Sequence, residues 1–302
     1  MTSETCFDKW VEGLTPKITV ADAARVALEH RLQAVLHYLP LAADRSDENL
    51  EYVHLLRVWS RRSMAALKLY KKVMPKKKWR CLGRKLKRIR DVAGNARDLD
   101  VLLSQIVAEE SRESKTFEIG VRRRRTKAQR PIRRCCDRMN RRSRLETLLK
   151  KMLKGISKNG EMTPLFENGA QDALRHVVER FHHAFPCDTN DLLAMHRFRT
   201  RVKDVRYAIE LLAPAFPIEL KDSVYPLVEE LQESLGTIND HAVAISRFSE
   251  WFEACHNKVD RRELKKRGSH ESEQITRSLE SFQKRWTNGE LTQLFASLTR
   301  MI

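Results

Sequence analysis

Histidine and basic side chains recur at helical spacing in one segment of the sequence. His54, Arg57, Arg61 and Lys68 stand at positions i, i+3, i+7 and i+14. On an α-helix this spacing places all four side chains along one stripe. Arginine engages phosphate oxygens through a rigid fork of donors, and histidine adds a donor whose charge changes near neutral pH. The chemistry that this stripe predicts is the binding of an oxyanion.

A second copy of the stripe lies 142 residues further along the chain. At this offset residues 54–103 align with residues 196–245 without a gap, and at an offset of 146 residues 27–40 align with 173–186. A single histidine near a helix start is better explained by a hydrogen bond to a carbonyl. The recurrence of the histidine with cations at the same spacing favours a role in binding. The alignment of the two segments predicts an internal duplication. The matching positions are His54 and His196, Arg57 and Arg199, Arg61 and Lys203, Gly94 and Gly236, and Asp98 and Asp240.

A third basic line follows the first stripe. Arg80, Arg84 and Lys87 share a helix face that runs on to Gly94 and Asp98. Glycine inside a helix costs about 1 kcal/mol relative to alanine, so Gly94 predicts the close approach of a neighbouring helix or of a ligand. Asp98 is expected to pair with an arginine of the facing helix and to orient it. By the repeat, Asp240 and Gly236 take the same structural roles.

The elements that must position these residues are helices. Gly and Pro together number 19 of 302 residues, good helix formers dominate, and no long segment alternates with a period of two. We expect an all-α fold of two four-helix bundles with long helices, related by a pseudo-two-fold duplication. The predicted domains are an N-terminal segment (1–19), a first bundle (20–160) and a second bundle (161–302). The predicted helices are 20–39, 47–73, 76–110, 118–154, 168–185, 189–213, 218–254 and 269–298, with breaks at Pro40 and Gly268.

The composition restricts the class of partner. The net charge is +18, so the natural partner is a polyanion: nucleic acid, inorganic polyphosphate or an anionic surface. The six cysteines form no CxxC pair, which indicates a reduced, intracellular protein. No secretory signal and no run of the roughly 18 apolar residues of a membrane span is visible. We expect a cytoplasmic protein.

The densest basic run, residues 121–134, contains Pro131, which is expected to break or kink its helix. This run could be a solvated face, a nucleic-acid patch or a flank of the oxyanion site. The sequence does not separate these readings, and we treat the run as a secondary binding surface.

Several of these segments resemble CHAD domains, the conserved-histidine α-helical domains. The segments VHLLRVWSRRSMAALKLY and NARDLDVLL resemble elements of the family's first half, and HRFRTRVKDVRYAIELL with LQESLGTINDHAVAI resembles those of its second half. The resemblance implies two four-helix bundles around a basic central surface that binds inorganic polyphosphate, for granule targeting or polyphosphate-linked regulation. The implied ligand contacts are His54, Arg57, Arg61, Arg62, His196, Arg199, Lys203 and Arg206, with Lys68, Arg84, Lys87 and Arg97 beside them.

The second half departs from the first at two of these positions. Asp204 stands where the first half has Arg62, and Asn239 stands where it has Arg97. We therefore expect the first half to bind more strongly.

No sequence motif for catalysis accompanies the basic stripes. A Gly-rich phosphate loop, a zinc-protease motif and paired carboxylates at useful spacing are all missing from the sequence. We expect a binding protein without catalytic residues, metal or cofactor. The alternative is a non-specific RNA or DNA binder, for which nucleic acid would be the stronger ligand instead of a weaker competitor. Exposed aromatic residues for base stacking are sparse, which counts against it.

Overall fold

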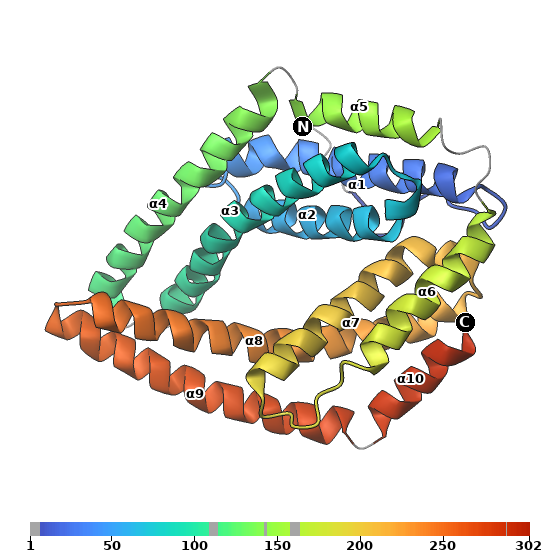
Figure 1. Ribbon diagram of the computed structural model, residues 1–302. Helices are drawn as coiled ribbons and strands as arrows, with labels where there is room; N and C mark the ends of the chain where they lie inside the picture. Colours follow the sequence, from blue (N-terminus) through green and yellow to red (C-terminus); the bar gives the residue numbers. More distant parts are fainter. Residues whose placement is uncertain (1–6, 109–113, 142–143, 158–163, 288) are drawn as a thin grey trace. The chain divides into compact units, whose positions relative to one another are not determined.

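The computed structural model describes residues 7–108, 114–141, 144–157, 164–287 and 289–302. The predicted all-α fold is confirmed, since the described residues form helices joined by short connections (Figure 1). The helices are α1 (Val20–Asp44), α2 (Glu51–Leu69), α3 (Lys76–Ala108), α4 (Ser114–Asn140), α5 (Arg144–Ser157), α6 (Phe166–His182), α7 (Leu192–Leu212), α8 (Tyr225–Ala254), α9 (Lys258–Trp286) and α10 (Glu290–Arg300).

The chain divides into two compact units, residues 1–169 and 170–302, here called unit 1 and unit 2. The division falls inside α6, between Gly169 and Ala170. The predicted boundary between residues 160 and 161 lies outside the described residues. Unit 1 contains α1–α5 and the first turn of α6, and unit 2 contains the remaining helices.

Each predicted fourth helix is in fact two helices. The predicted helix 118–154 corresponds to α4 and α5, and the predicted helix 269–298 corresponds to α9 and α10. In unit 2 the separation follows from Gly289, which adopts a left-handed conformation (φ 99°) at the start of α10. Glycine adopts such a conformation without the steric cost of a side chain.

The predicted helix breaks at Pro40 and Gly268 are wrong, and Pro131 does not break its helix, while a kink at Pro131 stays a prediction. Pro40 lies in α1, Pro131 in α4 and Gly268 in α9. Pro40 stands in the last two turns of α1, flanked by the buried residues Leu39, Ala42 and Ala43. Pro131 is exposed, so water can reach the carbonyl that its missing N–H leaves unbonded. Packing of the flanking apolar residues outweighs the local preference at each position.

Unit 1 is built on the successive packing of α1 against α2, α2 against α3 and α3 against α4. The buried side of α2 carries Val53, Leu56, Trp59 and Ala66. Because these residues recur every three to four positions, the intervening basic residues project from the opposite side of the helix. The burial of one α2 side therefore sets the direction of its basic stripe.

A buried polar network attaches α4 to the rest of unit 1. Arg125 donates a hydrogen bond to Asp100 of α3 and another to Gln129 (Nη1 to Oε1, 2.9 Å). The amide of Gln129 donates to the carbonyls of Ala42 (2.7 Å) and Ala43 (2.8 Å). These two carbonyls belong to the last turn of α1, which has no intrahelical donors for them. The network fixes which side of α4 is buried.

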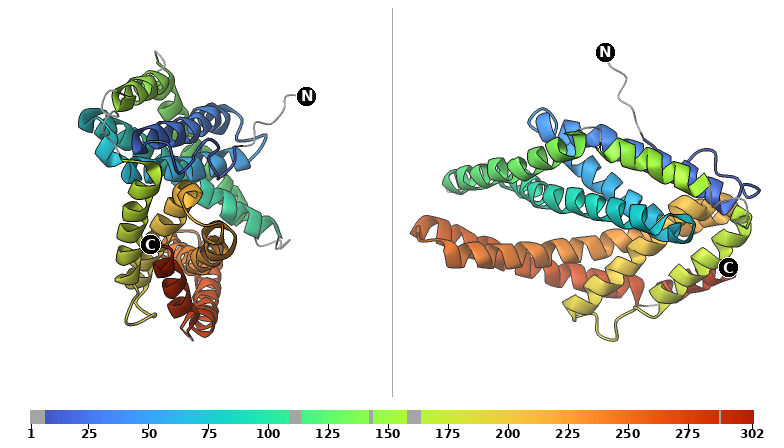
Figure 2. Two further views of the ribbon diagram at one scale, coloured as in Figure 1. Left: turned by 90° about the vertical axis from the view of Figure 1, so that its right-hand side faces the viewer. Right: turned by 45° about the horizontal axis from the view of Figure 1, so that its top comes forward.

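Unit 2 is dominated by the pair α8 and α9, which lie side by side along much of their lengths (Figure 2). The helix α7 packs against α8 and begins at Asp191, whose carboxylate accepts hydrogen bonds from the backbone N–H groups of Leu193 and Ala194. Within the described ranges, no helix is long and apolar enough to cross a membrane.

Candidate oxyanion-binding faces

The stripe of α2 faces a matching stripe on α3. Arg57 Nη1 donates to Asp98 Oδ1 at 2.7 Å and lies 3.4 Å from the carbonyl oxygen of Gly94. Both side chains are partly shielded from solvent, with exposed fractions of 24% and 30%. The ion pair expected of Asp98 is present, and it holds the guanidinium of Arg57 across the gap between α2 and α3.

We call this region the α2/α3 face. Its residues are those of the two stripes: His54, Arg57, Arg61 and Lys68 of α2, and Lys87, Asp91, Gly94, Arg97 and Asp98 of α3.

His54 lies at one end of the α2/α3 face beside two charged neighbours. Burial lowers the pKa of His54 below its ordinary value of 6.5, and the positive charge of Arg97 lowers it further. Glu51 acts in the opposite direction, but it also pairs with Arg97 (Nη1 to Oε1, 3.3 Å). The imidazole is therefore neutral in the free protein at neutral pH, and a bound anion would favour its protonated form.

The close approach of a neighbouring helix expected at Gly94 is wrong, whereas the close approach of a ligand stays a prediction. A methyl group in place of its hydrogen would meet no atom within 4 Å, and at Gly236 it would meet the guanidinium of Arg199 at 3.9 Å, an ordinary contact. Instead, the Gly94 carbonyl accepts from Arg57. The space beside the Gly94 Cα is thus open, and its carbonyl oxygen faces Arg57.

A groove continues the α2/α3 face toward the start of α3. It has a volume of about 690 Å³ and an apolar floor that includes Met64 and Trp79. Its basic lining residues are Lys68 of α2 and Arg80 and Arg84 of α3. Lys68 and Arg84, which the sequence placed on two different basic lines, therefore line the same groove. Arg80 joins them, although only its place on the third basic line singled it out in the sequence.

The structure does not place Arg62 with the stripe. Its guanidinium lies 4.9 Å from the centre of the buried Trp59 ring, and this ring packs against His30 of α1. Arg62 follows Arg61 directly, and successive residues of a helix differ in direction by about 100°. Arg62 therefore belongs to the α1 side of α2, where its contact with the ring stabilises packing.

The corresponding face of unit 2 is formed by α7 and α8. His196 Nδ1 lies 2.7 Å from Asn239 Oδ1, and Arg199 Nη2 lies 3.9 Å from Asp240 Oδ1. The arginine–aspartate pair of unit 1 thus has a looser equivalent here, with an Asp240 side chain that is 77% exposed. The helices α7 and α8 hold the counterparts of the unit 1 residues, but the contact between the arginine and the aspartate is longer.

Two further residues of α7 form ion pairs within unit 2. Arg206 pairs with Glu229 and with Glu210 (3.7 Å), and its Nε lies 3.2 Å from the Tyr225 hydroxyl. Its exposed fraction is 16%. This arginine therefore stabilises the contact between α7 and α8 and is a poor candidate for contact with an anion. Asp204, which replaces an arginine of the first half, pairs with Arg180 and Arg201.

The net positive charge of the protein arises from unit 1. Residues 1–169 contain 39 lysines and arginines against 20 acidic residues, whereas residues 170–302 contain 19 against 20. The formal net charge of +18 therefore arises entirely from unit 1. A long-range field that attracts anions is centred on this unit.

No cluster of three or more His, Cys, Asp or Glu side chains that could hold a metal ion occurs in the part of the chain that the structure describes.

The fold and the two faces define an all-helical protein with a basic, histidine-containing surface. The profile of the CHAD domain family matches residues 26–249. The chain belongs to this family.

The solved structures similar to this chain include the following two. The CHAD domain of the plant Ricinus communis has 20% sequence identity and a TM-score of 0.77, over 95% of this chain and 98% of that chain. PptA from Streptomyces chartreusis has 14% identity and a TM-score of 0.60, over 90% of this chain and 100% of that one. These likenesses establish the fold. The chain has no significant sequence match among curated proteins.

Proposed function

We propose that the protein binds inorganic polyphosphate, and that the α2/α3 face of unit 1 carries most of the binding. The observation that carries this proposal is the contact of Arg57 with Gly94 and Asp98, in the unit that holds all of the net positive charge. By helical spacing this contact turns the α2 stripe of Arg57, Arg61 and Lys68 toward the α3 stripe that includes Lys87 and Arg97. Such a row matches a ligand with a negative charge at every repeat along a chain.

Membership of the CHAD family supports the proposal, because the resemblance of the sequence to this family implied polyphosphate binding. The geometry of Arg57 supports it as well. Asp98 holds the guanidinium in place, so less side-chain freedom is lost when an anion binds. The open backbone at Gly94 leaves room for the ligand beside it.

The alternative is non-specific binding of RNA or DNA. The same cations would neutralise nucleic-acid phosphates. The aromatic residue that lines the groove beside Lys68 is Trp79, but its indole N–H donates to the Leu67 carbonyl (3.0 Å). The ring is thereby fixed against α2, so we rank nucleic acid as the weaker ligand.

We also propose that the protein binds polyphosphate without cleaving it, in the cytoplasm or at polyphosphate granules. Binding without chemistry is tested by incubation of the protein with long-chain polyphosphate and a divalent metal ion. Release of phosphate or shortening of the chains would contradict it. Localisation of a tagged copy relative to granules tests the second part.

The binding experiment is a competition at about physiological salt, where weak counterion-driven binding is suppressed. Labelled long-chain polyphosphate is displaced by unlabelled polyphosphate, single-stranded RNA or double-stranded DNA. We expect polyphosphate to compete at a lower concentration than either nucleic acid. Equal displacement by nucleic acid would reject the proposal in favour of the alternative.

A combined variant assigns the binding to the faces. Replacement of Arg57, Arg61, Arg199 and Lys203 by alanine should weaken polyphosphate binding by at least about tenfold, with the helical content unchanged. The matched control removes four exposed cations of α9, namely Arg262, Lys265, Lys266 and Arg277. If both variants lose the same affinity, net charge and not the faces governs binding.

A further inference from the structure

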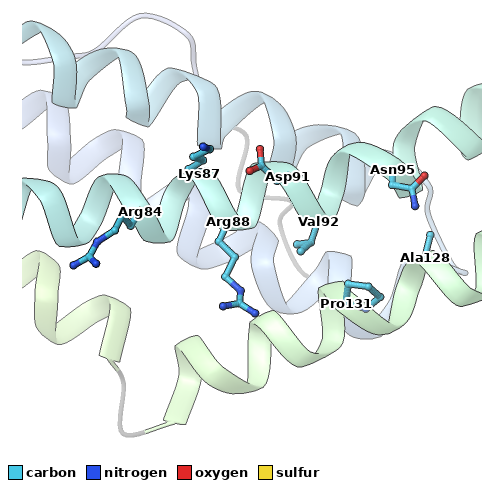
Figure 3. A pocket seen from close by; sticks show the side chains of 8 residues that line it. All are labelled: Arg84, Lys87, Arg88, Asp91, Val92, Asn95, Ala128 and Pro131. Carbon is cyan, nitrogen blue, oxygen red and sulfur yellow. The ribbon is translucent and has the colours of Figure 1, made fainter. Parts of the chain in front are cut away.

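A second groove lies on the other side of α3, between α3 and α4. It has a volume of about 580 Å³. In Figure 3, Arg84 and Arg88 point from α3 toward the side on which Pro131 of α4 lies, whereas Lys87 and Asp91 point to the opposite side of α3. The groove borders the α2/α3 face, to which Lys87 and Asp91 also belong. Its lining residues are Arg84, Lys87, Arg88, Asp91, Val92, Asn95, Ala128 and Pro131.

Both grooves of unit 1 share Arg84. This residue lines the groove beside Lys68 and also the groove between α3 and α4. Along α3, Arg80, Arg84 and Arg88 stand four residues apart, so each is about 6 Å further along the helix axis. The first lines one groove, the second lines both, and the third lines the other. The two grooves therefore meet at a continuous line of guanidinium groups.

The α4 side of the second groove is basic as well. Lys127, Arg134 and Arg138 stand four, three and seven residues from Pro131, a spacing that puts them on the same side of α4 as this groove residue. All three are exposed. The buried thiol of Cys135 lies near cations of both helices. Burial raises its pKa, while the charges of Arg88 of α3 and Arg138 of α4 lower it. These two arginines thus approach one point from α3 and from α4.

We infer that Arg84 joins the two grooves of unit 1 into one track for a phosphate chain. This inference rests on the proposed function and adds to it a preference for chain length. A short oligophosphate occupies the α2/α3 face alone. A longer chain continues past Arg84 into the groove between α3 and α4, where Arg88 and the α4 cations bind additional phosphates. Lys127 and Arg134, the exposed cations of the basic run 121–134 that share the side of Pro131, are then a flank of the same site.

The test measures affinity for tripolyphosphate and for long-chain polyphosphate in parallel, at a salt concentration near 0.15 M. The test variant carries Arg88→Ala and Arg138→Ala. Its matched control carries Arg123→Ala and Arg130→Ala, which removes the same charge from exposed positions of α4 that are turned by about 80–100° from Pro131. We expect the test variant to lose about tenfold in affinity for the long chain and little for tripolyphosphate, and the control to change both only slightly.

A second variant adds a charge instead of removing contacts. Asn95 lines the groove and is exposed, so Asn95→Glu introduces a carboxylate without disturbing the core, and glutamate is a good helix former. This variant should also weaken the binding of the long chain selectively. Circular dichroism confirms that its helical content is retained.

The outcomes separate the inference from the proposed function. If the native protein binds neither phosphate ligand, the proposed function fails. If it binds both, and the groove variants weaken the two ligands equally or not at all, the single track is wrong while polyphosphate binding stands. If the groove variants lower the affinity for single-stranded RNA but not for long polyphosphate, the groove serves nucleic acid and the inference is overturned.

Discussion

His54 is the titratable side chain of the α2/α3 face whose charge depends most directly on its surroundings. Burial and Arg97 lower its pKa below 6.5, against the opposing effect of Glu51. Arg57 and Arg61 also lower it. The unfolded chain therefore takes up a proton at His54 at a higher pH than the folded protein does. The unfolding free energy accordingly rises with pH through the interval below 6.5 and falls on acidification.

This linkage predicts a pH effect that depends on one residue. The melting temperature of the free protein should fall as the pH drops below 6.5, and His54→Gln should show a smaller fall. His30, whose pKa is also lowered, chiefly by burial, is retained in both proteins, so their difference reports on His54. Bound polyphosphate favours the protonated imidazole, so affinity should rise on acidification more in the native protein than in the variant. Identical pH profiles would exclude His54 from the face.

For single residues, the sequence predicted the ion pair of Asp98 correctly but placed Arg62 on the wrong side of α2. The pairing of Asp98 with a facing arginine followed from their helical spacing, because charged residues on opposing stripes have few other partners. Arg62 was assigned to the face by resemblance alone, although its position beside Arg61 turns it toward Trp59. Arg88 was missed, but its place one turn after Arg84 is a signal that could have found it.

The helix α4 illustrates how one element exposes many cations. Arg125 lies inside the basic run, yet it is only 8% exposed because it pairs with the buried Asp100. Burial raises the pKa of Asp100 even though Arg125 acts to lower it. The ion pair therefore does not fully offset the cost of burying the carboxylate. Its role is to select the buried side of α4, which leaves the remaining cations outward.

The stability of the protein is therefore predicted to depend on whether Asp100 and Arg125 are removed singly or together. Asp100→Leu leaves Arg125 as an unpaired buried charge and should lower the unfolding free energy by about 3 kcal/mol. The double variant Asp100→Leu with Arg125→Met removes both charges and should be considerably more stable than the single variant. Chemical denaturation measures the difference.

An exposed pair of the same helix provides the comparison. Glu118 and Arg122 lie one turn apart on α4, with an Arg122 side chain that is 59% exposed. Removal of the Glu118 carboxylate should cost less than about 1 kcal/mol. A single Asp100 variant no less stable than this comparison would show that the buried pair does not hold α4.

Element boundaries were the least predictable part of the fold. The basic and apolar periodicity of 118–154 continues across the separation of α4 from α5, so the pattern gave no reason to divide the segment. Pro131 and Gly268 disfavour helix locally, but the cost relative to alanine is only about 3 kcal/mol for the proline and about 1 kcal/mol for the glycine. The packing of a helix of 27 or 29 residues exceeds that cost.

At the scale of the whole molecule, the repeat distributes similar residues to two units with different charge. In unit 1 the cations greatly outnumber the acidic residues, whereas in unit 2 the two are nearly equal in number. Lys87 of α3 aligns at the offset of 142 with Glu229 of α8, the residue that pairs with Arg206. The internal duplication itself stays a prediction. The charge difference favours a division in which unit 1 binds the ligand and unit 2 contributes little.

The salt dependence of the binding constant measures how the binding is divided between unit 1 and unit 2. For a polyanion the logarithm of the binding constant falls linearly with the logarithm of the salt concentration, with a slope close to the number of ligand charges neutralised. Arg57→Ala with Arg61→Ala should reduce this slope by about two. The corresponding change in unit 2, Arg199→Ala with Lys203→Ala, should leave it nearly unchanged, because Asp240 already lies beside Arg199. Equal reductions would mean that both units bind the chain, and the uneven charge would then act only on the rate of association.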